Sequence, residues 1–124
     1  MLEVEVIGAA AIAPAEVERL TALACASAGV SDAHVAVAFV DSEEIRALNA
    51  EYRGKDRPTD VLSFPIDATD EAIGPRELGD VVISPEDTED LREAVVHGVL
   101  HLVGMDHEVD DGEMLALQRE ILTW

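Results

Sequence analysis

Three of the four histidines in this chain lie within eleven residues, at His97, His101 and His107. If this segment is helical, His97 and His101 are separated by about 40° around the axis and ~6 Å along it, so both imidazoles can reach one ion. Gly104 can adopt a left-handed conformation, and the resulting turn would bring His107 back as a third ligand. Three imidazoles with one open position are typical of a catalytic zinc site, whereas structural sites usually have four protein ligands. The spacing therefore predicts a metal site, with Zn²⁺ preferred over Cu²⁺ and Ni²⁺.

The alternative is that these histidines bind no metal. His97 and His101 would then be half-buried helix residues that hydrogen-bond to the backbone, and His107 would lie on the surface. In that case the spacing of the three would have arisen by chance. A zinc peptidase would carry a glutamate directly after the first ligand as its general base. That position here is Gly98, so peptide hydrolysis by this route is disfavoured. Asp106 and Asp80 are the candidates for a carboxylate near a metal-bound water. Asp106 directly precedes His107, and its expected role is to orient a ligand imidazole.

The second candidate functional site is a basic loop. Within five residues, Arg53, Lys55 and Arg57 supply three of the eight cations of the chain, including its only lysine. Arg53 can hold a phosphate in bidentate geometry and stabilise charge that develops beside a metal. We therefore predict that Arg53, Lys55 and Arg57 bind substrate and that Arg53 also contributes to catalysis. The equal alternative is a solvated turn whose charges balance the acidic neighbours Glu51, Asp56 and Asp60.

The composition limits the possible partners. The chain has 124 residues, with 8 Lys plus Arg against 27 Asp plus Glu, which gives a formal charge of −19. Such a charge argues against nonspecific duplex binding, which depends on Lys and Arg displacing phosphate counterions. At physiological salt, however, fields fade over ~8 Å, so a local basic cluster can still bind an anion.

The sequence also predicts a cytoplasmic protein. A single cysteine, Cys25, excludes an internal disulfide and is expected to be a buried, inert thiol. Glu3 and Glu5 occupy positions where a signal peptide would be positively charged, and no apolar run approaches the ~20 residues of a membrane span. We therefore expect no contact with a membrane. No glycine-rich nucleotide motif follows a predicted strand, so we also expect no nucleotide cofactor.

Hydrophobic periodicity and turn residues predict a single α+β domain, in which a mixed sheet of about four strands packs with helices. The metal site is expected on a helix of the C-terminal half and the turn that follows it. His34, alone at the start of a strand, is expected to be structural. The predicted elements are strand 2–7, a helix from Pro14 to Gly29, strand 34–40, helix 41–52, strands 61–66 and 78–83, a helix starting at Ser84 and Pro85 and ending at Gly104, and helix 111–122.

Three segments together resemble the bacterial YbeY-type endoribonucleases: Tyr52 to Pro65, Leu78 to Ile83 and Val96 to His107. The resemblance implies that residues 1–124 form one zinc-dependent, single-strand-specific endoribonuclease domain. Its implied roles are maturation of the 16S rRNA 3′ end and ribosome quality control. It also implies His97, His101 and His107 as ligands of one Zn²⁺ per chain, and Arg53 as the required basic residue. The implied partners are ribosomal RNA and the ribosome, with a basic small-subunit ribosomal protein suited to the acidic surface.

The sequence departs from the family pattern in three places. Met105 stands where the family usually has Tyr or His, so a ring contact is absent there. The connection from Ile83 to Val95 is shorter than usual, and the chain stops at Trp124 without the longer tail of many relatives. We expect the last two differences to trim the surface near the site.

The leading hypothesis is hydrolysis of single-stranded RNA, with a metal-bound water acting either as nucleophile or as base for the 2′-hydroxyl. One alternative is a metal-dependent hydrolase of a peptide or small acyl substrate, which would use the same water. Another is a ribosome-assembly binding factor with structural zinc, which the acidic surface would steer toward a basic protein.

Overall fold

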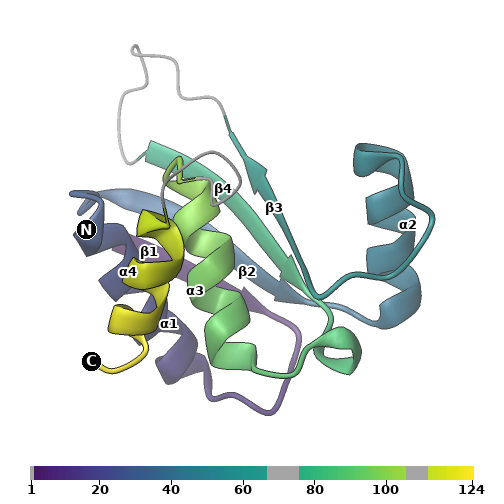
Figure 1. The fold of residues 1–124 in the computed structure, drawn as a ribbon, viewed down its shortest axis with the longest axis horizontal. Coiled ribbons are helices and arrows are strands. Elements are labelled where there is room, and N and C mark those ends of the chain that lie inside the picture. The colour runs from purple at the N-terminus through teal and green to yellow at the C-terminus, as the bar shows by residue number, and fades with distance from the viewer. Residues whose placement is uncertain (1, 67–75, 106–111) are drawn as a thin grey trace.

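The computed structural model describes residues 2–66, 76–105 and 112–124. Within these residues, four strands and four α-helices form an α+β fold, as predicted (Figure 1). In chain order the elements are β1 Leu2–Ile7, α1 Pro14–Ser27, β2 Ala33–Phe39, α2 Ser42–Arg53, β3 Val61–Pro65, β4 Arg76–Ile83, a 3₁₀ turn Pro85–Asp87, α3 Leu91–Leu102 and α4 Glu113–Ile121.

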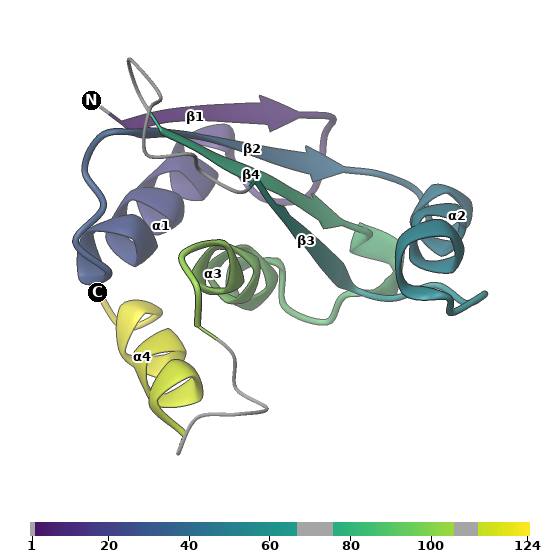
Figure 2. The same ribbon diagram turned by 90° about the horizontal axis from the view of Figure 1, so that it is seen from above.

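The four strands form one mixed sheet in the order β1-β2-β4-β3. β1, β2 and β4 are parallel, and β3 pairs antiparallel with β4 and lies at the edge. Helices α1, α3 and α4 lie on one side of the sheet, whereas α2 lies beyond the end at which β2 and β4 finish (Figure 2). This arrangement places α3 beneath the β3 edge and α2 beside that same edge.

The main core lies between the sheet and helices α1, α3 and α4. In β1 the side chains alternate, so that Val4 and Val6 turn toward the core while Glu3 and Glu5 face solvent. Val35 and Val37 of β2 are fully buried between β1 and β4. A smaller cluster joins Ile45 of α2 to Leu62 and Val82 on the opposite face of the sheet.

Cys25 is fully buried in the main core. Burial raises the pKa of its thiol to about 11, because a thiolate would lose its hydration there. Such a pKa favours the protonated thiol near neutral pH, and the predicted burial of Cys25 is confirmed. None of the helices in the described residues is long and apolar enough to cross a membrane.

One predicted boundary was wrong. The long helix predicted to start at Ser84 and Pro85 starts later. Residues Pro85–Asp87 form a single 3₁₀ turn, and the long helix, α3, begins only at Leu91. The Thr88 hydroxyl donates to the carbonyl oxygen of Ser84 at 2.6 Å, and the backbone at Thr88 and Asp90 is extended. Asp90 then caps α3, because its carboxylate accepts from the Glu93 N–H at 3.2 Å. Two capping signals compete in this segment, and the second one starts the long helix.

Candidate metal centre and anion-binding pocket

The structure brings the imidazoles of His97 and His101 together on α3. Their ring centroids are 4.8 Å apart at an interplanar angle of 75°, and the two Nε2 atoms are 3.2 Å apart. Both side chains are half-buried. The predicted juxtaposition of these residues thus follows directly from their i, i+4 spacing on a regular helix.

The separation of the two nitrogens fits a shared metal ion. In a tetrahedral zinc site with Zn–N bonds of about 2.0–2.1 Å, two ligand nitrogens lie about 3.3 Å apart. The 3.2 Å between the Nε2 atoms of His97 and His101 is close to this value. The negative end of the α3 dipole lies near His101 in the last turn, which also favours a cation.

Gln118 of α4 is a residue that the sequence analysis missed. Its Oε1 accepts a hydrogen bond from Nδ1 of His97 at 2.8 Å, and its side chain is only 5% exposed. Because an amide oxygen only accepts, this contact is a hydrogen bond for the His97 tautomer with its proton on Nδ1, and that tautomer keeps the lone pair of Nε2 toward His101. A sequence signal did exist, because Gln118 is the one polar residue among the buried positions of α4, with Met114 and Ile121.

Close packing of α3 on the sheet at Gly98 explains why no carboxylate follows His97. A Cβ atom at Gly98 would lie 2.5 Å from Cγ1 of Val81 and 3.2 Å from Cγ2 of Val61. The helix backbone therefore lies directly against the sheet at this position. Ser63 strengthens the contact, because its hydroxyl donates to the carbonyl oxygen of Gly98 at 2.9 Å. A glutamate cannot be accommodated there without moving α3 away from β3 and β4.

The turn after α3 has the predicted form. Gly104 has a φ of +100°, and its N–H donates to the carbonyl oxygen of His101 at 3.1 Å. The next N–H, that of Met105, donates to Leu100 at 3.0 Å, and the Met105 side chain packs against the main core. Asp106 and His107 lie outside the described residues, so the third ligand and its neighbour stay predictions.

The structure places the other candidate carboxylate away from the histidines. Val81 faces α3, as its approach to Gly98 requires, and the side chains of neighbouring strand residues alternate between faces. Asp80 therefore points to the opposite face of the sheet. It cannot serve a metal ion held by His97 and His101.

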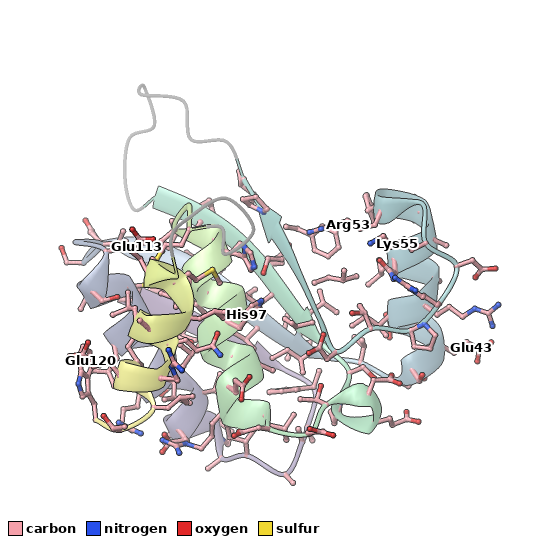
Figure 3. All side chains as sticks on the ribbon, viewed as in Figure 1. Glu43, Arg53, Lys55, His97, Glu113 and Glu120 are labelled. Carbon is pink, nitrogen blue, oxygen red and sulfur yellow. The ribbon has the colours of Figure 1, made fainter. Side chains whose placement is uncertain are left out.

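The three cations of the predicted basic loop line one pocket of about 150 Å³ between α2 and β3. In Figure 3, Arg53 at the end of α2 and Lys55 in the loop that follows point toward β3, whereas Glu43 points away. The Arg53 guanidinium donates to the Ser63 carbonyl oxygen at 3.5 Å, and the Asn49 amide donates to the Arg57 carbonyl oxygen at 2.9 Å. We call this the basic pocket; its lining residues are Asn49, Arg53, Lys55, Arg57, Thr59, Val61 and Leu62.

The charges of the basic pocket are not balanced in the way the turn hypothesis requires. Asp56 is paired with Arg46, with 2.9 Å between its Oδ1 and the arginine Nε. The Asp60 Oδ1 accepts from the Val61 N–H at 2.9 Å. Within residues 2–66, 76–105 and 112–124, no carboxylate oxygen forms an ion pair with Arg53, Lys55 or Arg57. This arrangement favours an anion-binding pocket.

A second cleft of about 460 Å³ adjoins the basic pocket and reaches His97, one of the two candidate metal ligands on α3. His97 and Gln118 line it, and Val61 lines both hollows. We call it the acidic cleft after five of its lining residues, Asp60, Asp87, Glu89, Asp90 and Glu93. The two hollows thus offer opposite charges on either side of one residue of β3.

The described part of the chain contains no group of three or more His, Cys, Asp or Glu side chains placed to hold a metal ion. His97 and His101 supply two nitrogen donors. A complete site requires at least one further ligand, and His107 is the residue that the sequence predicts for it.

Comparison with known proteins agrees with the resemblance noted in the sequence. The family model described as endoribonuclease YbeY matches residues 9–124. The endoribonuclease YbeY of Bacillus licheniformis is 42% identical, with 87% of this chain and 82% of the relative aligned. That of Geobacillus kaustophilus is 46% identical, with 86% and 82% aligned.

A solved structure extends the likeness to the fold. The solution structure of a Thermotoga maritima protein superposes with a TM-score of 0.57 at 29% identity, and the match covers 98% of this chain and 87% of that one. The fold, the three sequence segments and the family match agree over nearly the whole chain. The chain therefore belongs to the endoribonuclease YbeY family.

Proposed function

We propose that this protein is a zinc-dependent endoribonuclease that cleaves single-stranded RNA in the cytoplasm. Its proposed roles are maturation of the 16S rRNA 3′ end and ribosome quality control. The endoribonuclease names of its relatives support the reaction class. The observation that carries the proposal is the position of His97, which is paired with His101, and of a cationic pocket on either side of Val61 in β3.

Ser63 of β3 connects the two halves of the site. Its carbonyl oxygen accepts from Arg53, and its hydroxyl donates to the backbone of Gly98, the residue after His97. The guanidinium and the metal-binding helix are therefore held to the same strand residue. Such fixed placement is what stabilisation of a developing charge requires, because the donors need not reorganise during the reaction.

The residues divide the work as follows. His97 and His101 would hold Zn²⁺, together with His107, and Asp106 would orient an imidazole. When bound, zinc would supply a water with a pKa of about 7 and a Lewis acid for a phosphoryl oxygen. Arg53 would neutralise the phosphate that reacts, and Lys55 and Arg57 would hold the adjoining backbone. Gln118 would keep Nδ1 of His97 protonated and the ring in place.

Charge explains the expected preference for single strands. A chain with a net charge of −19 repels an extended polyanion except where its cations gather. The basic pocket is small, about 150 Å³, and suits a flexible backbone that can bend into it. A rigid duplex would also meet the acidic residues of the neighbouring cleft.

The proposed partners are ribosomal RNA and the ribosome, with a basic small-subunit ribosomal protein as a further contact. The acidic surface supports the last of these, because opposite potentials steer association. The packing of Gly98 against Val81 and Val61 counts against the peptide-hydrolase alternative, since no general base can occupy that position.

The test is cleavage of an end-labelled single-stranded RNA and of the same sequence in a duplex. We expect the zinc-loaded protein to cut the single strand, and the chelator-treated protein and His101→Ala to leave it intact. Arg53→Gln should lower the rate by about 10²–10³, the usual effect of losing one charge-stabilising donor. Arg19→Gln, which removes the same charge from α1, should cut at the normal rate. Equal cleavage with and without chelator would refute the proposal.

The chemistry of the product ends separates the two hydrolytic routes. A 2′,3′-cyclic phosphate requires attack by the 2′-hydroxyl, whereas direct attack by water leaves no cyclic product. The assembly-factor alternative predicts a different result, namely that His101→Ala loses its fold and its ribosome association together. A folded His101→Ala that still binds ribosomes but cuts no RNA would support the enzyme.

A further inference from the structure

We infer that Tyr52 forms a stacking platform for one unpaired nucleobase, beside the basic pocket. The inference rests on the proposed function for the class of substrate, RNA. It adds a binding site that recognises the base, whereas the basic pocket recognises only the sugar-phosphate backbone.

The Tyr52 side chain is 60% exposed, although it is large and mostly apolar. Its ring packs edge-to-face with that of Phe64, with centroids 5.2 Å apart at an angle of 68°. An edge-to-face contact covers at most one face of the tyrosine ring. The neighbour therefore restrains the ring and leaves flat apolar surface in contact with water.

Tyr52 and Arg53 contact β3 side by side. Tyr52 packs on Phe64, and the next residue, Arg53, donates to the carbonyl oxygen of Ser63, the residue before Phe64. Two consecutive residues of α2 thus contact two consecutive residues of β3. An aromatic face and an arginine without a carboxylate partner in the described residues are adjacent as a result.

This pairing matches the chemistry of one nucleotide, which presents a charged phosphate and a flat base. Proteins that bind single strands combine a cationic groove along the backbone with aromatic side chains on which bases stack. The basic pocket supplies the first part, and Tyr52 supplies the second. A base held in a duplex cannot reach such a platform, because both its faces are already stacked.

Packing alone does not explain an exposed aromatic ring at position 52 in a chain with so few aromatic residues. Only 3% of the chain is aromatic, and Tyr52 is its only tyrosine. Ile45 and Leu48 precede Tyr52 along the stripe of α2 that packs on the sheet, and Ile45 is fully buried. Tyr52 extends this stripe but remains mostly in solvent, so packing alone uses little of its surface.

Acidic residues on the sheet face opposite α1, α3 and α4 limit the platform to about one base. In the strand register Phe64 pairs with Asp80, and the same row continues through Ala36 to Glu5. Glu5 and Asp80 are exposed on this face. An RNA backbone that continued across the sheet would meet these carboxylates, so only a base next to the phosphate at Arg53 can use the ring.

The single tyrosine permits a direct test that does not depend on cleavage. Protein grown with 3-fluorotyrosine carries fluorine only at Tyr52, and its ¹⁹F NMR signal is followed in metal-depleted protein so that no RNA is cut. The probes are a single-stranded RNA oligonucleotide and an abasic oligonucleotide with the same sugar-phosphate backbone. We expect the base-containing strand to shift the signal and the abasic strand to bind with little shift.

Two variants separate stacking from packing. Tyr52→Phe keeps the aromatic face, and its RNA affinity should be unchanged within about twofold. Tyr52→Leu keeps apolar contact with Phe64 but has no π-face, and its affinity for the base-containing strand should fall about fivefold or more. Its affinity for the abasic strand and its melting temperature should stay close to those of the parent.

The outcomes distinguish this inference from the proposed function. Binding of both strands with the same ¹⁹F signal, or an equal loss for both strands in Tyr52→Leu, overturns the platform and leaves the nuclease intact. Failure to bind either strand removes the RNA substrate itself, and both proposals fall together.

Discussion

The amide oxygen of Gln118 in α4 lies 2.8 Å from Nδ1 of His97 in α3, and this contact determines which ring nitrogen can face a metal ion. A ligand histidine usually donates its other N–H to an acceptor that fixes the tautomer and orients the ring. Gln118 provides this acceptor in a buried position, across the packing between two helices. The C-terminal helix therefore contributes to the site although it carries none of the predicted ligands.

We predict that Gln118→Met weakens zinc binding about 10- to 100-fold, the usual cost of losing such a partner. Methionine keeps the length and apolar packing of the side chain but offers no comparable acceptor. Zinc affinity is measured by competition with a chromophoric chelator. Gln118→Glu, which keeps an acceptor, should retain the affinity of the parent.

Glu120→Gln is the matched control on α4, since its side chain is exposed and lies outside the acidic cleft. It should bind zinc like the parent. Equal zinc affinities for Gln118→Met and the parent would show that the Gln118 contact is only a packing feature. The ¹⁵N shifts of His97 in metal-free protein give an independent check, because they report which nitrogen carries the proton.

Gly98→Ala should destabilise the protein by about 1–2 kcal/mol. A new Cβ would lie 2.5 Å from Cγ1 of Val81, a branched side chain with little freedom to move. Overpacking of this kind costs about 1–3 kcal/mol, and the helix preference of alanine over glycine, up to ~1 kcal/mol, offsets part of it. Urea unfolding measures the free energy.

The double variant Gly98→Ala, Val81→Ala tests the cause of that loss. Removing the two Cγ atoms makes room for the new methyl group, so the combined destabilisation should be smaller than the sum of the single effects. Strict additivity would mean that the Gly98 position is sensitive for a reason other than its contact with Val81.

The salt dependence of RNA binding should be shallow. Three cations line the basic pocket, and each neutralised phosphate contributes about −0.7 to the slope of log K against log salt for a single strand. We therefore predict a slope of about −2 for the metal-free parent. Lys55→Gln should reduce its magnitude by about 0.7, as fluorescence anisotropy at several salt concentrations would measure. A steep slope of about −5 or beyond would mean that the RNA contacts a much larger cationic surface.

His34 should make stability depend on pH. Its Nδ1 lies 2.9 Å from an oxygen of Glu77, and Nε2 lies 3.6 Å from Glu5 on the neighbouring strand. The hydrogen bond to Glu77 raises the pKa of His34, with smaller contributions from the charges of Glu77, Glu5 and Glu3. The folded state therefore holds the proton more tightly than the unfolded state, whose pKa is about 6.5.

The added stability is fully present below about pH 6.5 and is lost as the pH rises through the raised folded pKa. Because the pair is partly exposed to solvent, the effect should stay below about 1 kcal/mol. Glu77→Gln should lower the melting temperature more at about pH 5.5 than at about pH 8.5. A deficit of the same size at both values would rule out His34 as the titrating group.

The sequence predicted the parts of this protein that depend on local periodicity. Strict alternation in β1 and the i, i+4 spacing of His97 and His101 each specify a geometry within one element, and both are found. Gly104 also adopts the predicted positive φ. Local signals compete, however, where two caps lie close together, and the helix predicted from Ser84 begins instead after Asp90.

The contacts between elements could not be predicted in the same way. The hydrogen bond from His97 to Gln118 joins α3 to α4, and the contacts of Ser63 join β3 to both α2 and α3. None of these follows from a pattern within one segment. The sequence alone makes Asp80 a candidate carboxylate for the site, whereas the strand register puts it on the other face of the sheet.

The central claim is that His97 and His101 hold a metal ion, and the bound metal of untagged protein tests it most directly. Protein purified without a histidine tag and exposed to excess zinc is freed of unbound metal and analysed by elemental mass spectrometry. We predict about one zinc per chain for the parent, and much less for His101→Ala with an unchanged circular dichroism spectrum. Substoichiometric metal in the folded parent, or an equal content in His101→Ala, would contradict the account.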